Sequence, residues 1–282
     1  MFELDEYVKA NSIDEVISIM KENKGAAKIV SGGTLIHELA GRGMLDNVKV
    51  LIDLQRLGLN YVKEEDDLIR IGAMTTHSKI HEHYKDEPRY GALAEAANLI
   101  PQIRNAATIG GCVCPGIPWL ELPVALLSYD SKLVVQGTEG ERLINLNEFY
   151  LDYLYTTLQP MEFLTEIRIP KPVDGTISKH ISHRITTVGV PIVSVAVTVV
   201  KDAKNMCTDA RIAIGSAGRV VMRAEKAEER LKGKVLEPKQ LFDDVVEAVL
   251  SKIKPINDML ATETYRKHIC KILVQKVLEE LE

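Results

Sequence analysis

The sequence contains few of the residues that mark several protein classes. Among 282 residues there are four cysteines and one tryptophan, and aromatic residues make up 5%. The cysteines stand at positions 112, 114, 207 and 270, which is too few and too scattered for a disulfide scaffold. No apolar run reaches the ~18 uncharged residues of a membrane-spanning helix. We therefore expect no membrane span.

The charge of the chain argues against one class of partner. The net charge of −5 gives no support for binding to nucleic acid. The first residues, Met-Phe-Glu-Leu-Asp-Glu-Tyr, lack the basic and then apolar pattern of a secretion signal. We expect a cytoplasmic protein, unless a partner carries it elsewhere. Apolar residues make up 46% of the chain, enough for one large domain or two compact ones.

Several sequence motifs of enzymes are missing. There is no Gly-Lys-Ser/Thr P-loop, no Gly-x-Gly-x-x-Gly turn, and no Ser-His-Asp or Cys-His set. Cys112 and Cys114 lack a second ligand pair, so they are expected to line a packed loop. His77, His81 and His83 lack a His-Glu-x-x-His pattern and are expected on a solvated helix face. The sequence thus predicts neither a catalytic side chain nor a metal site.

Two loops with almost no side-chain bulk stand out instead. Ser31-Gly32-Gly33-Thr34 follows an apolar run at 26–30, expected as a strand, and precedes a helix expected at 35–40. Thr108-Ile109-Gly110-Gly111 is similar in composition. Glycines let a backbone approach a ligand closely, and successive N–H groups in such turns bind phosphate oxygens. Each loop alone is compatible with a tight turn, but two such loops predict a ligand with two phosphates, such as a dinucleotide.

Hydrophobic periodicity and turn residues divide the chain into an α/β part and a following α+β part. Pro170-Lys171-Pro172 is the clearest boundary, and a smaller one is expected near residue 56. We predict domains at 1–56, 57–172 and 173–282. The helices are expected at 12–23, 35–40, 75–83, 90–99, 120–127, 147–150, 221–232, 238–253 and 261–281. The strands are expected at 26–30, 48–54, 61–63, 68–71, 133–135, 142–144, 164–169, 177–185, 192–200 and 210–214.

Six short motifs occur in the order found in one protein family. They are Val30–Thr34 (similar to the family's Ala-Gly-Gly-Thr), Ile71–Thr76, Gln102–Asn105 with Ala107–Gly111, Leu164–Pro170, Arg223–Glu225 with Leu231–Gly233, and Tyr265-Arg266. The chain resembles the FAD-binding medium subunit of molybdenum hydroxylases, the family of xanthine dehydrogenase, aerobic carbon monoxide dehydrogenase and aldehyde oxidoreductases. The resemblance implies an α+β fold: a two-part FAD-binding α/β domain of the PCMH type, followed by a small α+β domain with a three-stranded antiparallel sheet.

The resemblance also implies a cofactor and partners. FAD would be bound here, whereas molybdopterin and 2Fe-2S clusters would lie only in a large and a small partner subunit of a heterotrimer. Electrons would pass from the clusters through FAD to an acceptor such as NAD⁺ or a quinone. The alternatives are a flavin-free scaffold that keeps the fold, and an FAD oxidoreductase of the vanillyl-alcohol-oxidase type that acts alone.

The cofactor-binding residues follow from the same resemblance. Glu121 would hold the adenosine end, where the family usually has Asp, and Leu164 would pack on the flavin. Lys179 or His180 would stand near the isoalloxazine as a cation, by counting back from Arg184. The two loops would bind the pyrophosphate through backbone N–H groups of Ile29, Val30, Ser31, Gly32, Gly33, Thr34, Leu35 and Ile36, and of Ala107, Thr108, Ile109, Gly110, Gly111 and Cys112.

Three departures from the family pattern bear on this site. Cys112 stands where the family usually has Asn, and Leu35 where it often has Asp. The segment from Cys114 to Trp119 replaces a run of small polar residues. These changes are expected to alter FAD binding, and they are what keeps the flavin-free alternative open.

Overall fold

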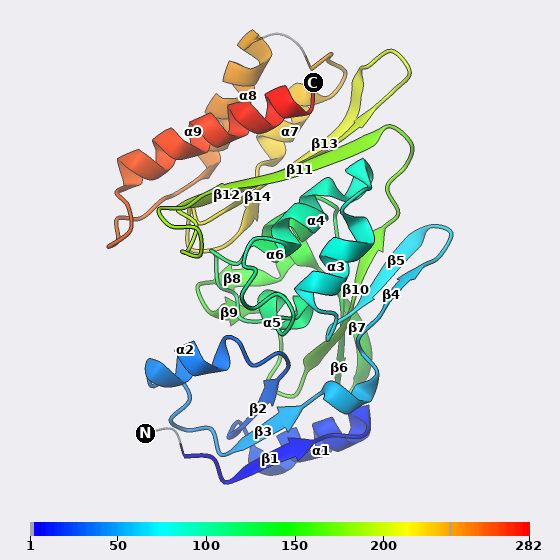
Figure 1. Ribbon diagram of the computed structural model, residues 1–282, viewed down its shortest axis with the longest axis vertical. Coiled ribbons are helices and arrows are strands. Elements are labelled where there is room, and N and C mark those ends of the chain that lie inside the picture. The colour runs from blue at the N-terminus through cyan, green and yellow to red at the C-terminus, as the bar shows by residue number, and fades with distance from the viewer. Residues whose placement is uncertain (1–2, 237–238) are drawn as a thin grey trace.

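The computed structural model describes residues 3–236 and 239–282, without the side chains of His37 and Lys239. The described chain forms an elongated molecule with residues 3–56 at one end and the last three helices at the other (Figure 1). Along these residues, no helix is both long and apolar enough to cross a membrane. Three main sheets and the helices between them build the fold.

The first unit is a small parallel sheet with helices on its two faces. The strands are β1 (Glu6–Lys9), β2 (Ala27–Val30) and β3 (Val50–Asp53), in the order β1-β3-β2. Helix α1 (Ile13–Asn23) buries Val16 and Met20, and α2 (Ile36–Gly41) lies beyond the other face. The parallel pairing of β2 with β3 confirms the pairing expected from a strand-helix-strand connection.

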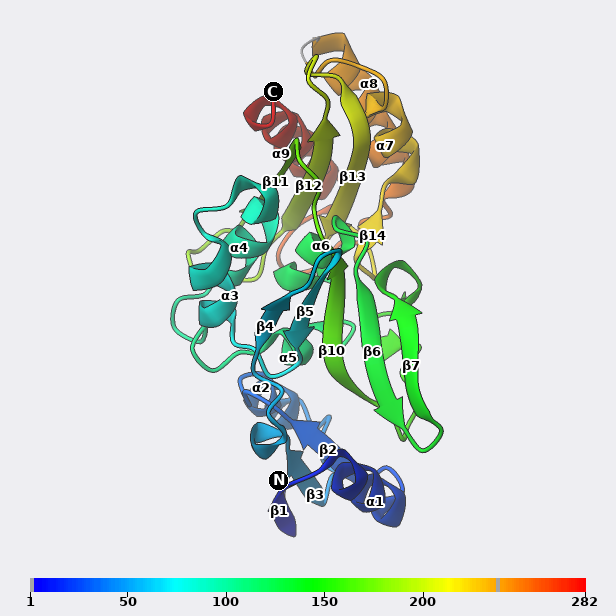
Figure 2. The ribbon, with the colours of Figure 1, turned by 90° about the vertical axis from the view of Figure 1, so that its right-hand side faces the viewer.

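The second unit is a five-stranded antiparallel sheet, whose open face is seen in Figure 2. Its order is β4-β5-β10-β6-β7, and its inner face packs on helices α3 to α6. A small hairpin of β8 and β9 lies beside it. The bounds are β4 (Val62–Glu64), β5 (Leu68–Gly72), α3 (His77–Tyr84), α4 (Gly91–Ala97), α5 (Ile109–Val113), α6 (Glu121–Leu127), β6 (Lys132–Gly137), β7 (Gly140–Asn145), β8 (Tyr150–Asp152), β9 (Tyr155–Thr156) and β10 (Phe163–Pro170).

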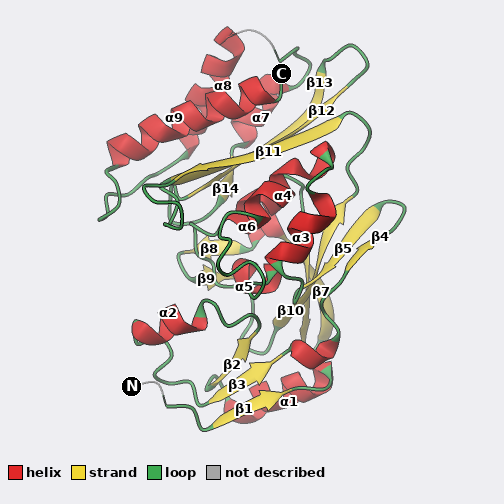
Figure 3. Ribbon diagram, viewed as in Figure 1, coloured by secondary structure: helices red, strands yellow, loops and turns green. Residues whose placement is uncertain are grey.

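The third unit is an antiparallel sheet between two helical layers (Figure 3). One face contributes Ala196 and Ala213 to the core around α4 and α6, and the other packs on the C-terminal helices. The domain limits near residues 56 and 172 stay a prediction. The bounds are β11 (Thr176–His183), β12 (Val193–Lys201), β13 (Cys207–Gly215), β14 (Met222–Arg223), α7 (Glu225–Leu231), α8 (Lys239–Lys252) and α9 (Glu263–Glu280).

The observed elements confirm the fold class and correct some details. β1 was missed because its residues are mostly exposed and lack an apolar run. The two-residue β14 adds a fourth strand where a helix from 221 was expected. In place of the helix expected at 147–150 there is a 3-10 turn (Leu146–Glu148), and β8 begins at Tyr150. The start of a helix at residue 238 lies outside the described residues. At the start of α1, Ser12 Oγ accepts from the backbone N–H of Glu15, and the Glu15 carboxylate accepts from the N–H of Asn11.

Candidate functional site

The first glycine loop joins β2 to α2 and leaves its backbone N–H groups open. In the described part of the chain, the N–H groups from Gly32 to Leu35 have no hydrogen-bond acceptor. Gly33 has a positive φ of 71°, which glycine adopts without steric cost. Leu35 is the N-cap residue of α2, and its side chain makes no capping hydrogen bond. The loop therefore presents a row of N–H donors at the start of a helix, a layout that suits an anion.

The second glycine loop is different, because its N–H groups are already used. Thr108 caps α5, and its Oγ1 accepts from the N–H of Gly111 at 3.2 Å. The N–H groups of Ile109 and Gly110 donate to the carbonyls of Thr75 and Ala73, both at 2.9 Å, and that of Cys112 donates to Thr108 at 3.0 Å. The expectation that these four amides bind a diphosphate is therefore wrong for this structure. Gly111 is exposed, whereas Thr108 is buried with its hydroxyl against Ser31.

The two loops touch each other, as the sequence predicted. Ser31 Oγ lies 2.5 Å from Thr108 Oγ1. The backbone of Gly32 packs so tightly on the second loop that a Cβ there would lie 1.8 Å from the carbonyl oxygen of Ala106. Only glycine fits this contact. Residues 77 positions apart in the chain thus form one surface.

His77 lies against the second loop. Its backbone N–H donates to the carbonyl of Ala107 at 3.0 Å, and its ring nitrogen Nε2 is buried without a partner in the described chain. Burial lowers the pKa of His77 to about 4, although a hydrogen bond with the Thr108 backbone opposes that shift. The expected solvated histidine face is therefore wrong for His77. Within the described residues, no three His, Cys, Asp or Glu side chains are grouped as a metal site.

Glu121 lies in a buried polar cluster instead of on an open surface. It stands at the start of α6 and forms an ion pair with Arg184, while His180 Nε2 lies 3.8 Å from Glu121 Oε1. Both ring nitrogens of His180, Glu121 Oε1 and Arg184 Nε are buried without partners in the described chain. Burial lowers the pKa of His180 to about 3. His180 is therefore neutral near pH 7, and the expected positive charge on it is wrong.

Lys179, the other expected cation, is neutralised by two carboxylates. Its Nζ lies 3.1 Å from Glu95 on α4 and 3.1 Å from Glu280 on α9. Glu95 also accepts from the backbone N–H of His180 at 2.7 Å. Lys179 thus joins β11 to helices of two units. The structure shows no uncompensated cation at either of these two positions.

The remaining sequence candidates lie in the core. Leu164 is buried in β10 at a register shift, and Cys112 is buried in α5. Burial raises the pKa of the Cys112 thiol to about 12, so it is unreactive at neutral pH. Trp119 packs on Tyr153, with ring centroids 5.7 Å apart. Cys112 is therefore packed, as the simpler expectation had it, but it lies in a short helix rather than in a loop.

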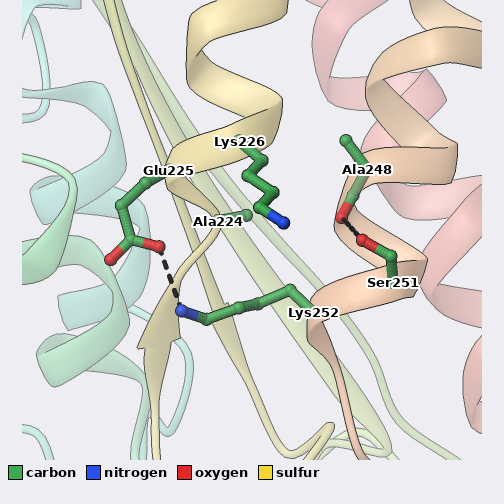
Figure 4. Close-up of a pocket in the computed structure, with 6 residues that line it drawn as sticks. All are labelled: Ala224, Glu225, Lys226, Ala248, Ser251 and Lys252. Atoms are coloured by element: carbon green, nitrogen blue, oxygen red, sulfur yellow. Dashed lines mark hydrogen bonds and ion pairs between the residues drawn. The ribbon is translucent and has the colours of Figure 1, made fainter.

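The motif Arg223-Ala224-Glu225 serves the fold at a different place. Arg223 donates to the buried Glu228 and to Asp130, which ties β14 to α7 and to the second unit. A cavity of about 280 Å³ lies beside it between α7 and α8, and Glu225 pairs with Lys252 there at 3.1 Å (Figure 4). Neither glycine loop lines this cavity. Sequence reasoning missed the Arg223–Asp130 bridge and the Glu121–Arg184 pair, because each connects residues more than 60 positions apart in the chain.

Comparison with known proteins places this geometry in a family. Residues 1–172 match the family model described as FAD binding domain in molybdopterin dehydrogenase, and residues 181–281 match the CO dehydrogenase flavoprotein C-terminal domain. The alpha subunit of the 6-hydroxypseudooxynicotine dehydrogenase complex of Paenarthrobacter nicotinovorans is 28% identical, over 97% of this chain and 93% of its own length. The carbon monoxide dehydrogenase medium chain of Hydrogenophaga pseudoflava is also 28% identical, over 97% and 95%.

A solved structure agrees with these matches. Carbon monoxide dehydrogenase from Hydrogenophaga pseudoflava superposes with a TM-score of 0.93 and 26% identity, over 99% of this chain and 97% of that one. The residues of this chain fit FAD, because one glycine loop has open N–H donors and it contacts a second loop in which Gly111 is exposed. The chain belongs to the family of FAD-binding medium subunits of molybdenum hydroxylases, and it is an oxidoreductase subunit.

Proposed function

We propose that this chain passes electrons from 2Fe-2S clusters of a small partner subunit through its FAD to an external acceptor, NAD⁺ or a quinone. In this proposal a large molybdopterin-containing partner oxidises the organic substrate, and the complex works in the cytoplasm. The names of the relatives support it, since they are a medium chain of carbon monoxide dehydrogenase and a subunit of a dehydrogenase complex. FAD supplies the exchange between one-electron transfer and hydride transfer.

One observation carries the proposal: the contact between the two glycine loops. A pyrophosphate needs several N–H donors and close backbone approach. Gly32 to Leu35 supply the donors, and the contact of Ser31 with Thr108 brings the second loop to the same place. These residues would bind and orient the pyrophosphate. The neighbouring candidates Ile29, Val30 and Ile36 would hold the loop through the first unit's core.

The buried cluster on α6 and β11 would serve one end of the cofactor. Adenosine and isoalloxazine lie on opposite sides of the pyrophosphate, so an extended FAD presents them at different places. Glu121 and His180 lie 3.8 Å apart, and hence they would contact the same end rather than opposite ends. The ion pair of Glu121 with Arg184 leaves this cluster without net charge, because His180 is neutral. Its residues would orient the cofactor through hydrogen bonds more than through charge.

Flavin binding is tested on the purified full-length chain. We expect bands near those of bound flavin and release of FAD on denaturation. Gly33→Ala is a mild change in the donor row, since a Cβ there meets nothing closer than Val30 at 3.9 Å but must adopt a positive φ. We expect it to weaken FAD binding about tenfold, whereas Gly25→Ala, which has equally open surroundings at a positive φ, should leave binding unchanged. A chain that binds no flavin would support the scaffold alternative.

The partners are tested by affinity purification of the tagged chain from its native cells. We expect a large molybdopterin subunit and a small 2Fe-2S subunit to copurify in equal amounts. Reduction of the complex by its organic substrate should bleach the cluster and flavin absorbance, and adding NAD⁺ or a quinone should identify the acceptor by restoring it. A purified single chain that oxidises an aldehyde or a purine without partners would contradict the proposal.

A further inference from the structure

Ser31 makes the polar side-chain contacts that join the first unit to the rest of the chain. Among the side chains described, two hydrogen bonds connect residues up to 56 with later residues, and Ser31 Oγ makes both. One is to Met74 Sδ at 2.9 Å and the other is the 2.5 Å contact with Thr108 Oγ1. No ion pair within the described residues crosses the same boundary. Ser31 is therefore placed to set the position of one glycine loop against the other.

The two hydroxyl groups have few ways to share their hydrogens. Each hydroxyl carries one hydrogen and two acceptor lone pairs. Thr108 Oγ1 already accepts from the N–H of Gly111. If Thr108 donates to Ser31, the Ser31 hydrogen is left for the weak acceptor Met74 Sδ. If Ser31 donates to Thr108, both lone pairs of Thr108 are filled, and its hydrogen must point to a further acceptor.

A pyrophosphate bound at the loops would supply that acceptor. Its oxygens are charged, and hydrogen bonds to charged acceptors are about twice as strong as neutral ones. We propose that Ser31 is a positioning residue: it donates to Thr108 and so turns the Thr108 hydroxyl to donate to the FAD pyrophosphate. This inference rests on the proposed FAD binding.

The relay is tested by a double-mutant cycle on FAD affinity with the full chain. Ser31→Ala should weaken FAD binding about tenfold. Thr108→Val should weaken it further, since it also removes the cap of α5. In the double variant, the loss should equal that of Thr108→Val alone, because Ser31 acts through Thr108. Ser31→Thr, which keeps a hydroxyl, should restore the affinity, and Ser18→Ala, an exposed serine of the same unit, should leave it unchanged.

Phosphorus NMR of bound FAD supplies a signal that does not depend on activity. The pyrophosphate resonances should move in Ser31→Ala and return in Ser31→Thr. Wild-type affinity in a folded Ser31→Ala variant, or losses that multiply in the double variant, would overturn the relay while leaving FAD binding intact. A wild-type chain without affinity for FAD would overturn the proposed function, and the relay with it. Thermal unfolding of each variant without FAD separates these results from a folding defect.

Discussion

The two glycine loops are alike in sequence and opposite in the use of their backbones. In the first, the N–H groups from Gly32 to Leu35 have no acceptor among the described residues, whereas in the second the N–H groups from Ile109 to Cys112 donate to acceptors within the chain. The first loop can therefore bind an anion through its backbone N–H groups, and the second loop packs against the first. Composition alone does not separate a binding loop from a supporting loop, because the difference lies in where the acceptors stand.

The source of the internal acceptors explains the difference. Ala73 and Thr75 follow β5 directly, and their carbonyls lie next to the second loop because Thr76 and Thr108 form a bridge. The first loop has no such neighbour, and it meets the second through Ser31 and Gly32. The carbonyls that follow β5 thus accept from the N–H groups of the second loop, whereas the N–H groups of the first loop stay open for a ligand.

The largest expected effect comes from separating the loops. Gly32→Ala would place a Cβ 1.8 Å from the carbonyl oxygen of Ala106, which is backbone and cannot rotate away. We expect the loops to move apart, with a loss of about 3 kcal/mol in the free energy of unfolding and loss of FAD binding. Denaturant unfolding and flavin titration measure both. Unchanged stability and affinity would show that the contact between the loops does not matter.

The sequence allowed much of this arrangement to be predicted, because it depends on local patterns. The strand before the first loop, the helix after it and the parallel pairing of β2 with β3 follow from short apolar runs and paired glycines. The internal use of the second loop's amides did not follow, since their acceptors at Ala73 and Thr75 stand more than 30 positions earlier in the chain. Only the fold brings them together.

The polar cluster shows the same limit. The family resemblance implied Glu121 as a ligand contact, but its partner Arg184 lies 63 residues away. His180 was expected to be charged, and burial keeps it neutral instead. The burial of a particular polar side chain depends on what the rest of the chain packs around it. The pattern of neighbouring residues therefore did not give the protonation state of this cluster.

A buried histidine beside the second loop is expected to make the stability of the chain depend on pH. His77 lies against the second loop, with a pKa lowered from 6.5 to about 4 by burial. Its folded-state pKa is below its unfolded value, so its contribution to stability is present above about pH 6.5 and is lost as the pH falls toward the folded pKa. We expect His77 to account for a loss of about 2 kcal/mol in the free energy of unfolding between pH 7 and pH 5.

Substitution isolates this histidine from the others. His77→Gln should flatten the pH dependence of unfolding by that amount. His180 would keep its own contribution in this variant, because burial lowers its pKa as well. Equal slopes for His77→Gln and the wild type would mean that the imidazole behind the second loop is freely solvated.

The smallest expected effect distinguishes the hydroxyls of the two loops in the cofactor-free chain. Thr108 caps α5 through the N–H of Gly111, whereas Thr34 makes no side-chain hydrogen bond within the described residues. Thr108→Val should lower the free energy of unfolding by about 1 kcal/mol, and Thr34→Val should leave it within error. Because both variants replace a hydroxyl by a methyl group, unequal unfolding midpoints would reflect the hydrogen bonds that the Thr108 hydroxyl makes with Gly111 and Ser31. Equal midpoints would mean that the conformation of the second loop does not depend on its cap, and that the hydrogen bonds to the carbonyls of Ala73 and Thr75 are enough to keep it.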